Sequence, residues 1–447
     1  MNAIGSVLVA MGHHVSGSDS ADSPALQRLR QLGAETHVGH DLNWIGAADV
    51  VARSTAIPAD NVELVEAERR GLRVWRRSEL LAAVCAQRRT AAVSGTHGKT
   101  TTSAMLALVL RAGGLNPSMI VGGDIVGVGS GAGWDPLGEW LVVEADESDG
   151  TFLELGAEAV VVTSVEPDHL DFYGSEGAMR AAFARFVGDA PGPAVLCLDD
   201  RGAAALAEFH RPGPSITYGV SDSADLRISD VVLGRADARF SLSVKGGSVE
   251  GGSVGPVVLS VPGLHNIRNA TAALALGNAL GVAWDAAVAG IGSYRGVARR
   301  FEVRGERDGV TYIDDYGHLP AEVSATLAAA HAGGWERIVT VFQPHRYSRT
   351  EALWRDFARA FTGSDVTFVT DIYPAGERPR PGITGELIVR AVRAADSVAD
   401  VRYAPTLDDA VAQLRQVLRP GDLCLTLGAG DVTTLPGRMM AAGSPGD

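Results

Sequence analysis

The chain contains 447 residues, carries a net charge of −14 and is 46% apolar. This length is too great for one ordinary hydrophobic core, so we expect two or three domains. The acidic balance disfavours nucleic acid or an anionic membrane as the main partner. No apolar run approaches the ~20 residues of a membrane span, and the three cysteines are scattered without a CxxC pair. We therefore expect a cytoplasmic protein.

The first two thirds of the chain form two blocks of alternating strand and helix patterns. In the first block, residues 1–87, strands are expected at 15–18, 49–54 and 72–75. The second block, residues 88–299, begins with a strand at 90–94, a glycine-rich loop and a helix at 100–112. It continues with strands at 140–145 and 159–164, an antiparallel flank within 213–263 and a helix at 266–280.

The third block covers residues 300–447 and begins with a hairpin-like segment at 301–314. Further strands are expected at 338–342, 367–370 and 423–427, separated by helical stretches. Such alternation in every block predicts an α/β protein with mainly parallel sheets, whose ligands bind at the carboxyl ends of the strands.

A glycine-rich loop carries the strongest chemical signal. Residues 95–101 read GTHGKTT and stand between an apolar strand and a helix. The backbone N–H groups of such a loop converge on phosphate oxygens, and Lys99 can reach the β- and γ-phosphates. Only two of the 39 basic residues are lysines, Lys99 and Lys245, which indicates a specific need for an ammonium here. The predicted ATP contacts are Gly95, Thr96, His97, Gly98, Lys99, Thr100 and Thr101.

Acidic residues follow the next two strands. Residues 144–149 read EADESD, and carboxylates at a strand end can hold Mg²⁺ against nucleotide phosphates. A solvated acidic loop is the alternative. The following strand ends in EPDHLD, residues 166–171, where a histidine could be a second metal ligand, although a lone histidine is more often packed or exposed. The predicted metal ligands are Thr100, Glu144 and His169.

Two clusters in the third block combine histidines with other polar groups. Residues 314–318 read DDYGH and residues 343–349 read QPHRYSR, each after an expected strand. A guanidinium fork matches a carboxylate or a phosphate, so the clusters favour an anion-binding site. Either cluster alone could be an ordinary surface loop.

Taken in chain order, the motifs resemble the Mur ligase family over essentially the whole chain. They are GTHGKTT, EADESD, PDHLD, HNIRNA at 265–270, DDYGH and PHRYSRT. The resemblance implies a Rossmann-like domain for a UDP-sugar at 1–87 and a central P-loop domain for ATP at 88–299. A Rossmann-like domain for an amino acid would follow at 300–447. His97, Ser148 and the 345–349 stretch favour the branch that adds L-alanine.

The resemblance implies ATP-dependent amide ligation with Mg²⁺. The carboxylate of UDP-N-acetylmuramate would attack the γ-phosphate of ATP, and the amine of L-alanine would then attack the resulting acyl phosphate. The reaction would serve peptidoglycan precursor synthesis and be carried out by a monomer or weak homodimer. Lys99, His318 and Arg346 are the expected catalytic residues.

Other roles carry over at positions that match the family's motifs. Asn266 and Asn269 are expected at the adenine, Asp315 at the ribose or around the metal, and Arg300 near the phosphates. The residues expected at L-alanine are His318, His345, Arg346 and Arg349. Those expected at the UDP-sugar are Asp19, Ser54 and Thr55.

Three features depart from the family's pattern. Leu319 replaces a second histidine after DDYGH, so that histidine is dispensable if the chain is active. The helix at 177–186 contains no lysine that could be carboxylated, which again suits the alanine-adding branch. The family's first strand and diphosphate-binding glycine loop would precede Met1, so we expect an N-terminal sheet without that strand and weak binding of the UDP-sugar.

Other functions remain possible at this point. A ligase of the same family attaches an intact tripeptide to the same UDP-sugar. A degenerate paralogue would bind nucleotide without reaction, and a P-loop kinase or ATPase would release phosphate without the amino acid.

Overall fold

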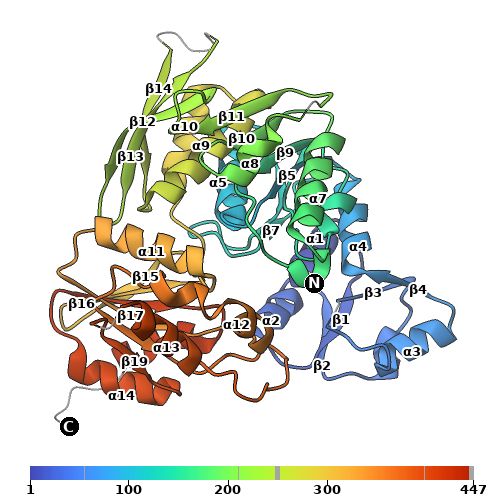
Figure 1. The fold of residues 1–447 in the computed structure, drawn as a ribbon. Helices are drawn as coiled ribbons and strands as arrows, with labels where there is room; N and C mark the ends of the chain where they lie inside the picture. The colour runs from blue at the N-terminus through green and yellow to red at the C-terminus, as the bar shows by residue number, and fades with distance from the viewer. Residues whose placement is uncertain (55, 210, 247–251, 397, 442–447) are drawn as a thin grey trace. The chain divides into compact units, whose positions relative to one another are not determined.

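The structure is a computed structural model that describes residues 1–54, 56–209, 211–246, 252–396 and 398–441 (Figure 1). The chain divides into two compact units. The first comprises Met1–Asp230, Phe240–Val257 and Arg268–Tyr294, and the second comprises Val231–Arg239, Val258–Ile267 and Arg295–Asp447. Among the described residues, no helix is both long and apolar enough to cross a membrane.

The N-terminal part of the first unit contains two small parallel sheets, β1-β2 and β3-β4. Its elements are α1 (Asn2–Ala10), β1 (Ser16–Asp19), α2 (Pro24–Gln31), β2 (Glu35–Val38), η1 (Leu42–Ile45), β3 (Val50–Arg53), α3 (Val62–Arg69), β4 (Arg73–Arg76) and α4 (Arg77–Cys85). The strands expected at 15–18, 49–54 and 72–75 are confirmed as β1, β3 and β4, whereas β2 was not expected. All four strands are exposed or half-buried.

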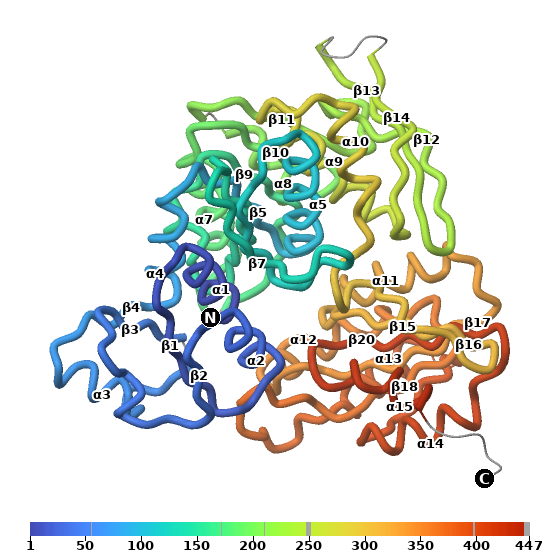
Figure 2. The backbone as a smooth tube through the Cα atoms, turned by 180° about the vertical axis from the view of Figure 1, so that it is seen from behind, coloured from blue at the N-terminus to red at the C-terminus, as the bar shows by residue number. Residues whose placement is uncertain are grey.

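A ten-stranded sheet forms the core of the first unit, in the order β14-β13-β12-β11-β10-β9-β5-β8-β6-β7. The strands from β5 to β10 are β5 (Arg89–Ser94), β6 (Ser118–Ile120), β7 (Ala132–Gly133), β8 (Trp140–Glu144), β9 (Ala159–Val162) and β10 (Ala194–Cys197). Strand β5 pairs in parallel with β8 on one side and with β9 on the other. Near-continuous apolar runs suit strands covered on both faces, and β9 and β10 are buried throughout. Figure 2 shows β5, β9 and β10 side by side.

Helix α5 (Lys99–Ala112) follows the glycine-rich loop and is buried from Thr100 to Leu110. It packs against α10 (Trp284–Ser293). This close approach requires Gly290, because a Cβ there would meet backbone atoms of Val109 within 3 Å. The remaining helices of this region are η2 (Thr151–Glu154), α6 (Leu170–Tyr173), α7 (Glu176–Asp189), α8 (Arg201–Leu206) and α9 (Leu264–Ala279). The loop and its helix are therefore anchored in a tightly packed core.

The flank of this sheet consists of β11 (Ser215–Gly219), β12 (Leu226–Leu233), β13 (Ala238–Val244) and β14 (Ser253–Leu259). Strands β12 and β13 are neighbours joined by a short turn, and only an antiparallel pair can be joined so directly. Strand β11 is still parallel to β10 and β12, so the antiparallel flank begins later than residue 213. Residues 247–251 of the expected flank lie outside the described residues.

The second unit contains a six-stranded sheet in the order β15-β16-β20-β17-β18-β19. Its strands are β15 (Glu302–Arg307), β16 (Val310–Asp315), β17 (Arg337–Phe342), β18 (Val366–Val369), β19 (Val401–Tyr403) and β20 (Asp422–Leu427). The β15–β16 hairpin is antiparallel and the other pairs are parallel, in agreement with the sequence.

The helices of the second unit follow its strands. They are α11 (Pro320–Ala332), α12 (Tyr347–Leu353), η3 (Asp356–Arg359), α13 (Glu386–Ala395), α14 (Leu407–Val417), η4 (Asp431–Thr434) and α15 (Leu435–Ala441). Two separate clusters of buried apolar residues hold these layers together, one including Phe342 and Leu327 and the other including Phe368 and Leu414. The unit is thus an α/β domain with its own core.

Candidate functional site

Three predicted motifs of the first unit meet at one edge of its sheet. The glycine-rich loop follows β5, the EADESD segment follows β8, and the PDHLD segment follows β9. Because these three strands are parallel neighbours, their carboxyl ends lie together. The order of the strands is therefore sufficient to support the expectation that these motifs form one site.

The loop geometry requires two of its glycines. Gly95 and Gly98 have φ values of +132° and +79°. A Cβ at Gly95 would collide with the Thr163 side chain, and one at Gly98 would collide with the side-chain amide of Asn269. Both glycines thus adopt a backbone conformation that residues with a Cβ disfavour. The close contact at Gly98 also shows that Asn269, which is expected at the adenine, lies against the loop.

Part of the loop backbone is already bonded to the neighbouring strand end. The N–H of Thr96 donates to the carbonyl oxygen of Ser164 at 3.0 Å, and the N–H of His97 donates to the Ser164 hydroxyl at 3.0 Å. These two amides are therefore used within the protein, and ATP contacts by these residues stay a prediction. Amides from Gly98 onward, at the start of α5, suit a phosphate better.

The Lys99 ammonium is surrounded by acceptors. Its Nζ donates to the carbonyl oxygens of Gly95 and Thr96 at 2.7 and 3.3 Å and to Glu147 Oε1 at 2.9 Å. Burial alone would lower the pKa of Lys99, but Glu147 and Asp146 raise it, so the ammonium stays charged. The sequence predicts a role for the acidic segment, but nothing in EADESD shows that Glu147 is the carboxylate that faces the lysine.

Two of the three predicted metal ligands lie together. The Thr100 hydroxyl donates to Glu144 Oε1 at 3.0 Å, and the N–H of Gly122 donates to Glu144 Oε2 at 2.6 Å. A hydroxyl and a carboxylate beside a phosphate loop are the oxygen donors that a hard cation such as Mg²⁺ prefers, so these residues fit the metal.

His169, the third predicted ligand, stands at a strained position. Its backbone is left-handed with φ of +52°, and its Nε2 lies 3.3 Å from Asp168 Oδ2. Across the described ranges of the chain, no group of three or more His, Cys, Asp or Glu side chains is arranged to hold a metal. A metal role for His169 stays a prediction.

In the second unit, Asp315 ends β16 and is buried. Its carboxylate accepts hydrogen bonds from the N–H groups of Phe301 and Gly317 at 2.7 and 2.8 Å and from the Thr326 hydroxyl at 3.2 Å. Burial raises its pKa, against the lowering effect of Arg300 and these donors. Asp315 therefore fixes the backbone around it, and its expected nucleotide contact stays a prediction.

The other nucleotide residues predicted for this unit, Asn266 and Arg300, both precede its first strand, β15, in the chain. The amide Nδ2 of Asn266 donates to the Pro262 carbonyl oxygen at 2.7 Å. The guanidinium of Arg300 lies 5.1 Å from the centre of the Tyr316 ring. Their contacts with ATP stay predictions.

His318 follows β16 and is half-buried, with 14% of its side chain exposed. Its Nδ1 lies 3.1 Å from the Tyr316 carbonyl oxygen and 3.4 Å from Glu322. Since both neighbours can only accept, Nδ1 carries the proton, and the neutral ring has its lone pair on Nε2. Burial lowers the pKa of His318, with Glu322 opposing and Arg349 adding to the effect.

His345 has the opposite tautomer. Its Nδ1 accepts from Arg349 at 3.1 Å, so the proton of the neutral ring is on Nε2. Burial, His318 and the arginines lower its pKa to about 4. The rings of His318 and His345 have centres 5.7 Å apart. Sequence reasoning thus predicted a pair that the fold does bring together.

Arg346 and Arg349 stand at the start of α12. Arg346 has φ of +69°, a conformation uncommon outside glycine, and its N–H donates to the Tyr373 carbonyl oxygen at 2.9 Å. Such strain is often found at functional positions. Glu377 accepts from the N–H and hydroxyl of Ser348 at 3.0 and 2.5 Å and so holds this helix start, a role with no sequence signature.

The predicted UDP-sugar residues lie at strand ends of the N-terminal sheets. Asp19 ends β1, and its Oδ1 accepts from the N–H of Ala21 at 3.2 Å. Ser54 follows β3 and is half-buried, whereas Thr55 lies outside the described residues. Beside Asp19, the Ser18 hydroxyl donates to Glu63 at 2.8 Å, a contact not expected from the sequence.

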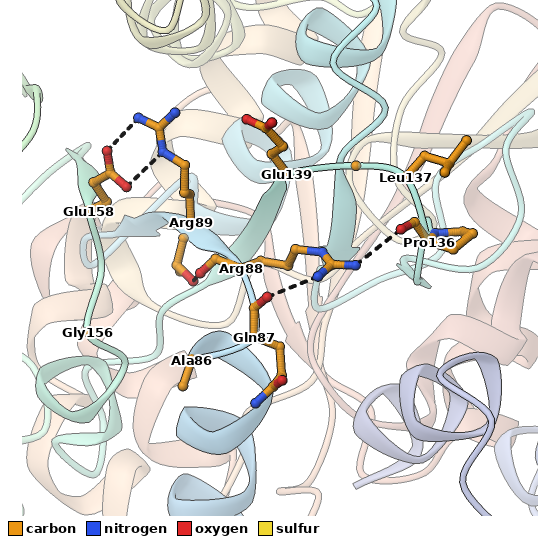
Figure 3. A pocket seen from close by; sticks show the side chains of 11 residues that line it. Ala86, Gln87, Arg88, Arg89, Pro136, Leu137, Glu139, Gly156 and Glu158 are labelled. Atoms are coloured by element: carbon orange, nitrogen blue, oxygen red, sulfur yellow. Dashed lines mark hydrogen bonds and ion pairs between the residues drawn. The ribbon is translucent and has the colours of Figure 1, made fainter.

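A pocket of about 640 Å³ lies at the other edge of the ten-stranded sheet (Figure 3). It is lined by the amino ends of strands, where Arg89 pairs with Glu158 at 2.6 Å and stacks over Trp140. None of the predicted site residues lines it. We assign the chemistry to the carboxyl edge, where the phosphate loop stands.

Family models match three consecutive parts of the chain. The model described as Mur ligase family, catalytic domain, matches residues 1–89, the Mur ligase middle domain matches 93–277, and Mur ligase, glutamate ligase domain, matches 299–430. A protein with three such α/β domains and a phosphate loop in the middle one is a ligase of this class. The chain belongs to the Mur ligase family.

Several relatives are similar over almost their whole length. UDP-N-acetylmuramate–L-alanine ligases of Agrobacterium fabrum and Pelotomaculum thermopropionicum are both 44% identical to it over 97% of the chain, covering 92% and 93% of their own lengths. The crystal structure of the UDP-N-acetylmuramate–alanine ligase of Thermotoga maritima is 26% identical, with a TM-score of 0.80 over 98% of this chain and 96% of that one. A murein peptide ligase of Psychrobacter arcticus is 22% identical with a TM-score of 0.71, which shows the shared fold alone.

Proposed function

We propose that the protein joins L-alanine to the carboxylate of UDP-N-acetylmuramate, with ATP cleaved to ADP and phosphate, in peptidoglycan precursor synthesis. Relatives of this name at 44% identity over 97% of the chain are the observation that carries the proposal. The residues of each unit suit one half of the reaction.

The first unit suits phosphoryl transfer. The amides at the start of α5 and the Lys99 ammonium would hold the β- and γ-phosphates, so that the substrate carboxylate can attack the γ-phosphorus and form an acyl phosphate. Mg²⁺ bound by Thr100 and Glu144 would neutralise phosphate charge. The role of these residues is positioning and electrostatics rather than covalent chemistry.

The second unit suits the amino acid. Arg346 and Arg349 are donors for its carboxylate, because a guanidinium offers a fork of N–H groups. His318 has a lone pair on Nε2 and a lowered pKa, so it is neutral at pH 7 and able to accept a proton from the attacking amine. His345 presents an Nε2–H donor instead, which suits an anionic oxygen.

Phosphate release tests the proposal directly. With UDP-N-acetylmuramate and ATP present, release should depend on L-alanine. Release without the amino acid would favour an ATPase, no release would favour a nucleotide-binding paralogue, and a requirement for an intact tripeptide would favour the recycling branch.

Two variants test the site. Lys99→Ala should abolish turnover and leave the fold intact, and retained turnover would show that the loop does not bind the phosphates of ATP.

Arg346→Ala should raise the KM for L-alanine far more than the KM for ATP, and equal effects would contradict the assignment of Arg346 to the amino acid.

Several narrower features belong to the same proposal. Use of Mg²⁺ is supported by the Thr100–Glu144 pair, and a cytoplasmic location by three free cysteines. The division of labour among domains 1–87, 88–299 and 300–447, and a monomer or weak homodimer, stay predictions. Calorimetry with UDP-N-acetylmuramate measures whether the N-terminal sheets bind the UDP-sugar.

A further inference from the structure

A buried ion pair holds the lysine of the phosphate loop. The side chain of Lys99 is 17% exposed and that of Glu147 only 3%. Glu147 Oε1 lies 2.9 Å from Lys99 Nζ, while two loop carbonyl oxygens accept the other ammonium protons. All three donors of Lys99 therefore have partners within the protein.

Glu147 is held in place by a rigid turn. The carbonyl oxygen of Glu147 accepts from the Tyr173 hydroxyl and, at 3.2 Å, from the N–H of Gly150. On either side, Asp146 accepts from the N–H of Ser148 at 3.0 Å and Asp149 from the N–H of Thr151 at 3.1 Å. The backbone thus keeps the carboxylate directed at the lysine.

The second carboxylate oxygen of Glu147 is not engaged by the residues that the structure describes. Among the residues that the structure describes, Oε2 is buried without a hydrogen-bond partner. A buried carboxylate without donors is unfavourable, so Lys99 is the main group that stabilises it. Any anion that draws Lys99 away leaves this carboxylate poorly compensated.

We propose that Glu147 is an internal counter-ion that competes with nucleotide phosphate for Lys99 and so limits how tightly the loop holds ATP and ADP. The inference rests on the proposed function of the loop. Binding of a phosphate at Lys99 weakens the Lys99–Glu147 pair, and loss of the phosphate restores it. The pair therefore opposes nucleotide binding and favours release of ADP after the reaction.

Glu147→Gln tests this competition. The change keeps the shape of the side chain and removes its charge, so ATP and ADP should bind roughly fivefold tighter or more. Isothermal titration calorimetry without divalent cations measures both affinities, and the inhibition constant of ADP in the full reaction should fall by the same factor. Unchanged or weaker binding would overturn the proposal.

Asp149→Asn is the matched control. It removes one negative charge from the same segment, but its carboxylate is bonded to the N–H of Thr151 rather than to Lys99. We expect its nucleotide affinity to change less than twofold. An equal gain in both variants would overturn the specific pairing and leave only a general effect of charge.

Two further experiments, with Glu147→Asp and with Glu147→Gln in the Lys99→Ala background, test whether Glu147 acts through Lys99. Glu147→Asp retains the charge but shortens the side chain, so it should bind nucleotide with an affinity between those of wild type and Glu147→Gln, and it serves if Glu147→Gln does not fold. In Lys99→Ala, Glu147→Gln should no longer tighten binding, and a gain there would contradict competition for Lys99. Wild-type ATP affinity in Lys99→Ala alone would instead refute the proposed function of the loop.

Discussion

At the scale of single residues, two neighbouring histidines are kept neutral in different tautomers. The Tyr316 carbonyl oxygen fixes the proton of His318 on Nδ1, and Arg349 fixes that of His345 on Nε2. Their ring centres are 5.7 Å apart, so protonation of one disfavours protonation of the other. Neutrality gives the site one acceptor and one donor, which a pair of protonated histidines could not provide.

Acidification should destabilise the protein through His345. Its pKa is about 4 in the folded protein against an ordinary 6.5, so between these values only the unfolded chain binds the proton. His345 therefore does not lower the free energy of unfolding above pH 6.5. As the pH falls to about 4, it lowers that free energy by roughly 3 kcal/mol in total. His345→Gln should therefore show a smaller drop in unfolding temperature between pH 7.5 and pH 5 than wild type. Equal drops would contradict the lowered pKa.

The sequence identified the titratable groups of the site better than their partners. Lys99, Glu144 and His318 follow strands in recognisable motifs, so their positions could be predicted. The roles of Glu147 and Glu377 could not be predicted, because the partner of each carboxylate depends on the direction that the folded backbone gives to the side chain. Glu377 acts on a residue 29 positions away, beyond the reach of any local pattern.

At the scale of elements, helix α12 begins without a side-chain cap of its own. Glu377 supplies that cap by accepting from Ser348, and these hydrogen bonds hold its pKa below the ordinary value although burial opposes them. A helix of seven residues has little stability alone, so its start depends on this contact.

Glu377→Ala should therefore disturb the proposed amino-acid site. Loss of a cap costs about 1 kcal/mol of local stability and releases the helix start beside Arg346. We expect the KM for L-alanine to rise several-fold while the KM for ATP changes little. Glu351→Ala is the control, since this carboxylate on the same helix pairs with Arg380 at the surface. Equal changes in the two variants would count against the cap.

The loop after β6, residues 121–131, links α2 to Glu144, a predicted metal ligand. Arg28 on α2 donates two hydrogen bonds of 2.7 Å to Asp124, and the N–H of Gly122 in the same loop donates to Glu144. The side chains of Arg28 and Asp124 are 36% and 44% exposed, so the pair contributes at most about 1 kcal/mol to global stability. Its effect should be local.

Asp124→Ala should loosen this loop without unfolding the protein. We expect faster hydrogen exchange at residues 121–131 and a several-fold higher Mg²⁺ concentration for half-maximal activity, because Glu144 loses a fixed neighbour. The exchanged pair Arg28→Asp with Asp124→Arg should restore both properties in part. Failure of the exchanged pair to improve on Asp124→Ala would show that the ion pair is not the cause.

At the scale of the whole molecule, several buried strands were predictable from the sequence, whereas some short strands were not. Strands β5, β17 and β20 each have six residues, of which at least five are buried. Strands β2, β6 and β19 have three or four residues and were missed. Strands β1, β3 and β4 have four residues each and were predicted, so length alone does not decide. Strand order was also beyond the sequence, since β5 lies between β8 and β9 through pairings distant in the chain.

Binding of ATP should stabilise the protein mainly through the phosphate loop of the first unit. At a hundredfold excess over the dissociation constant, ATP contributes about 2.7 kcal/mol, which corresponds to an increase of roughly 5 °C in the unfolding temperature of a unit of this size. Differential scanning calorimetry should show this increase in wild type and in His345→Gln, whose substitution lies in the second unit. Lys99→Ala should show none, because the phosphates lose their ammonium. An undiminished increase in Lys99→Ala would place the nucleotide elsewhere in the molecule.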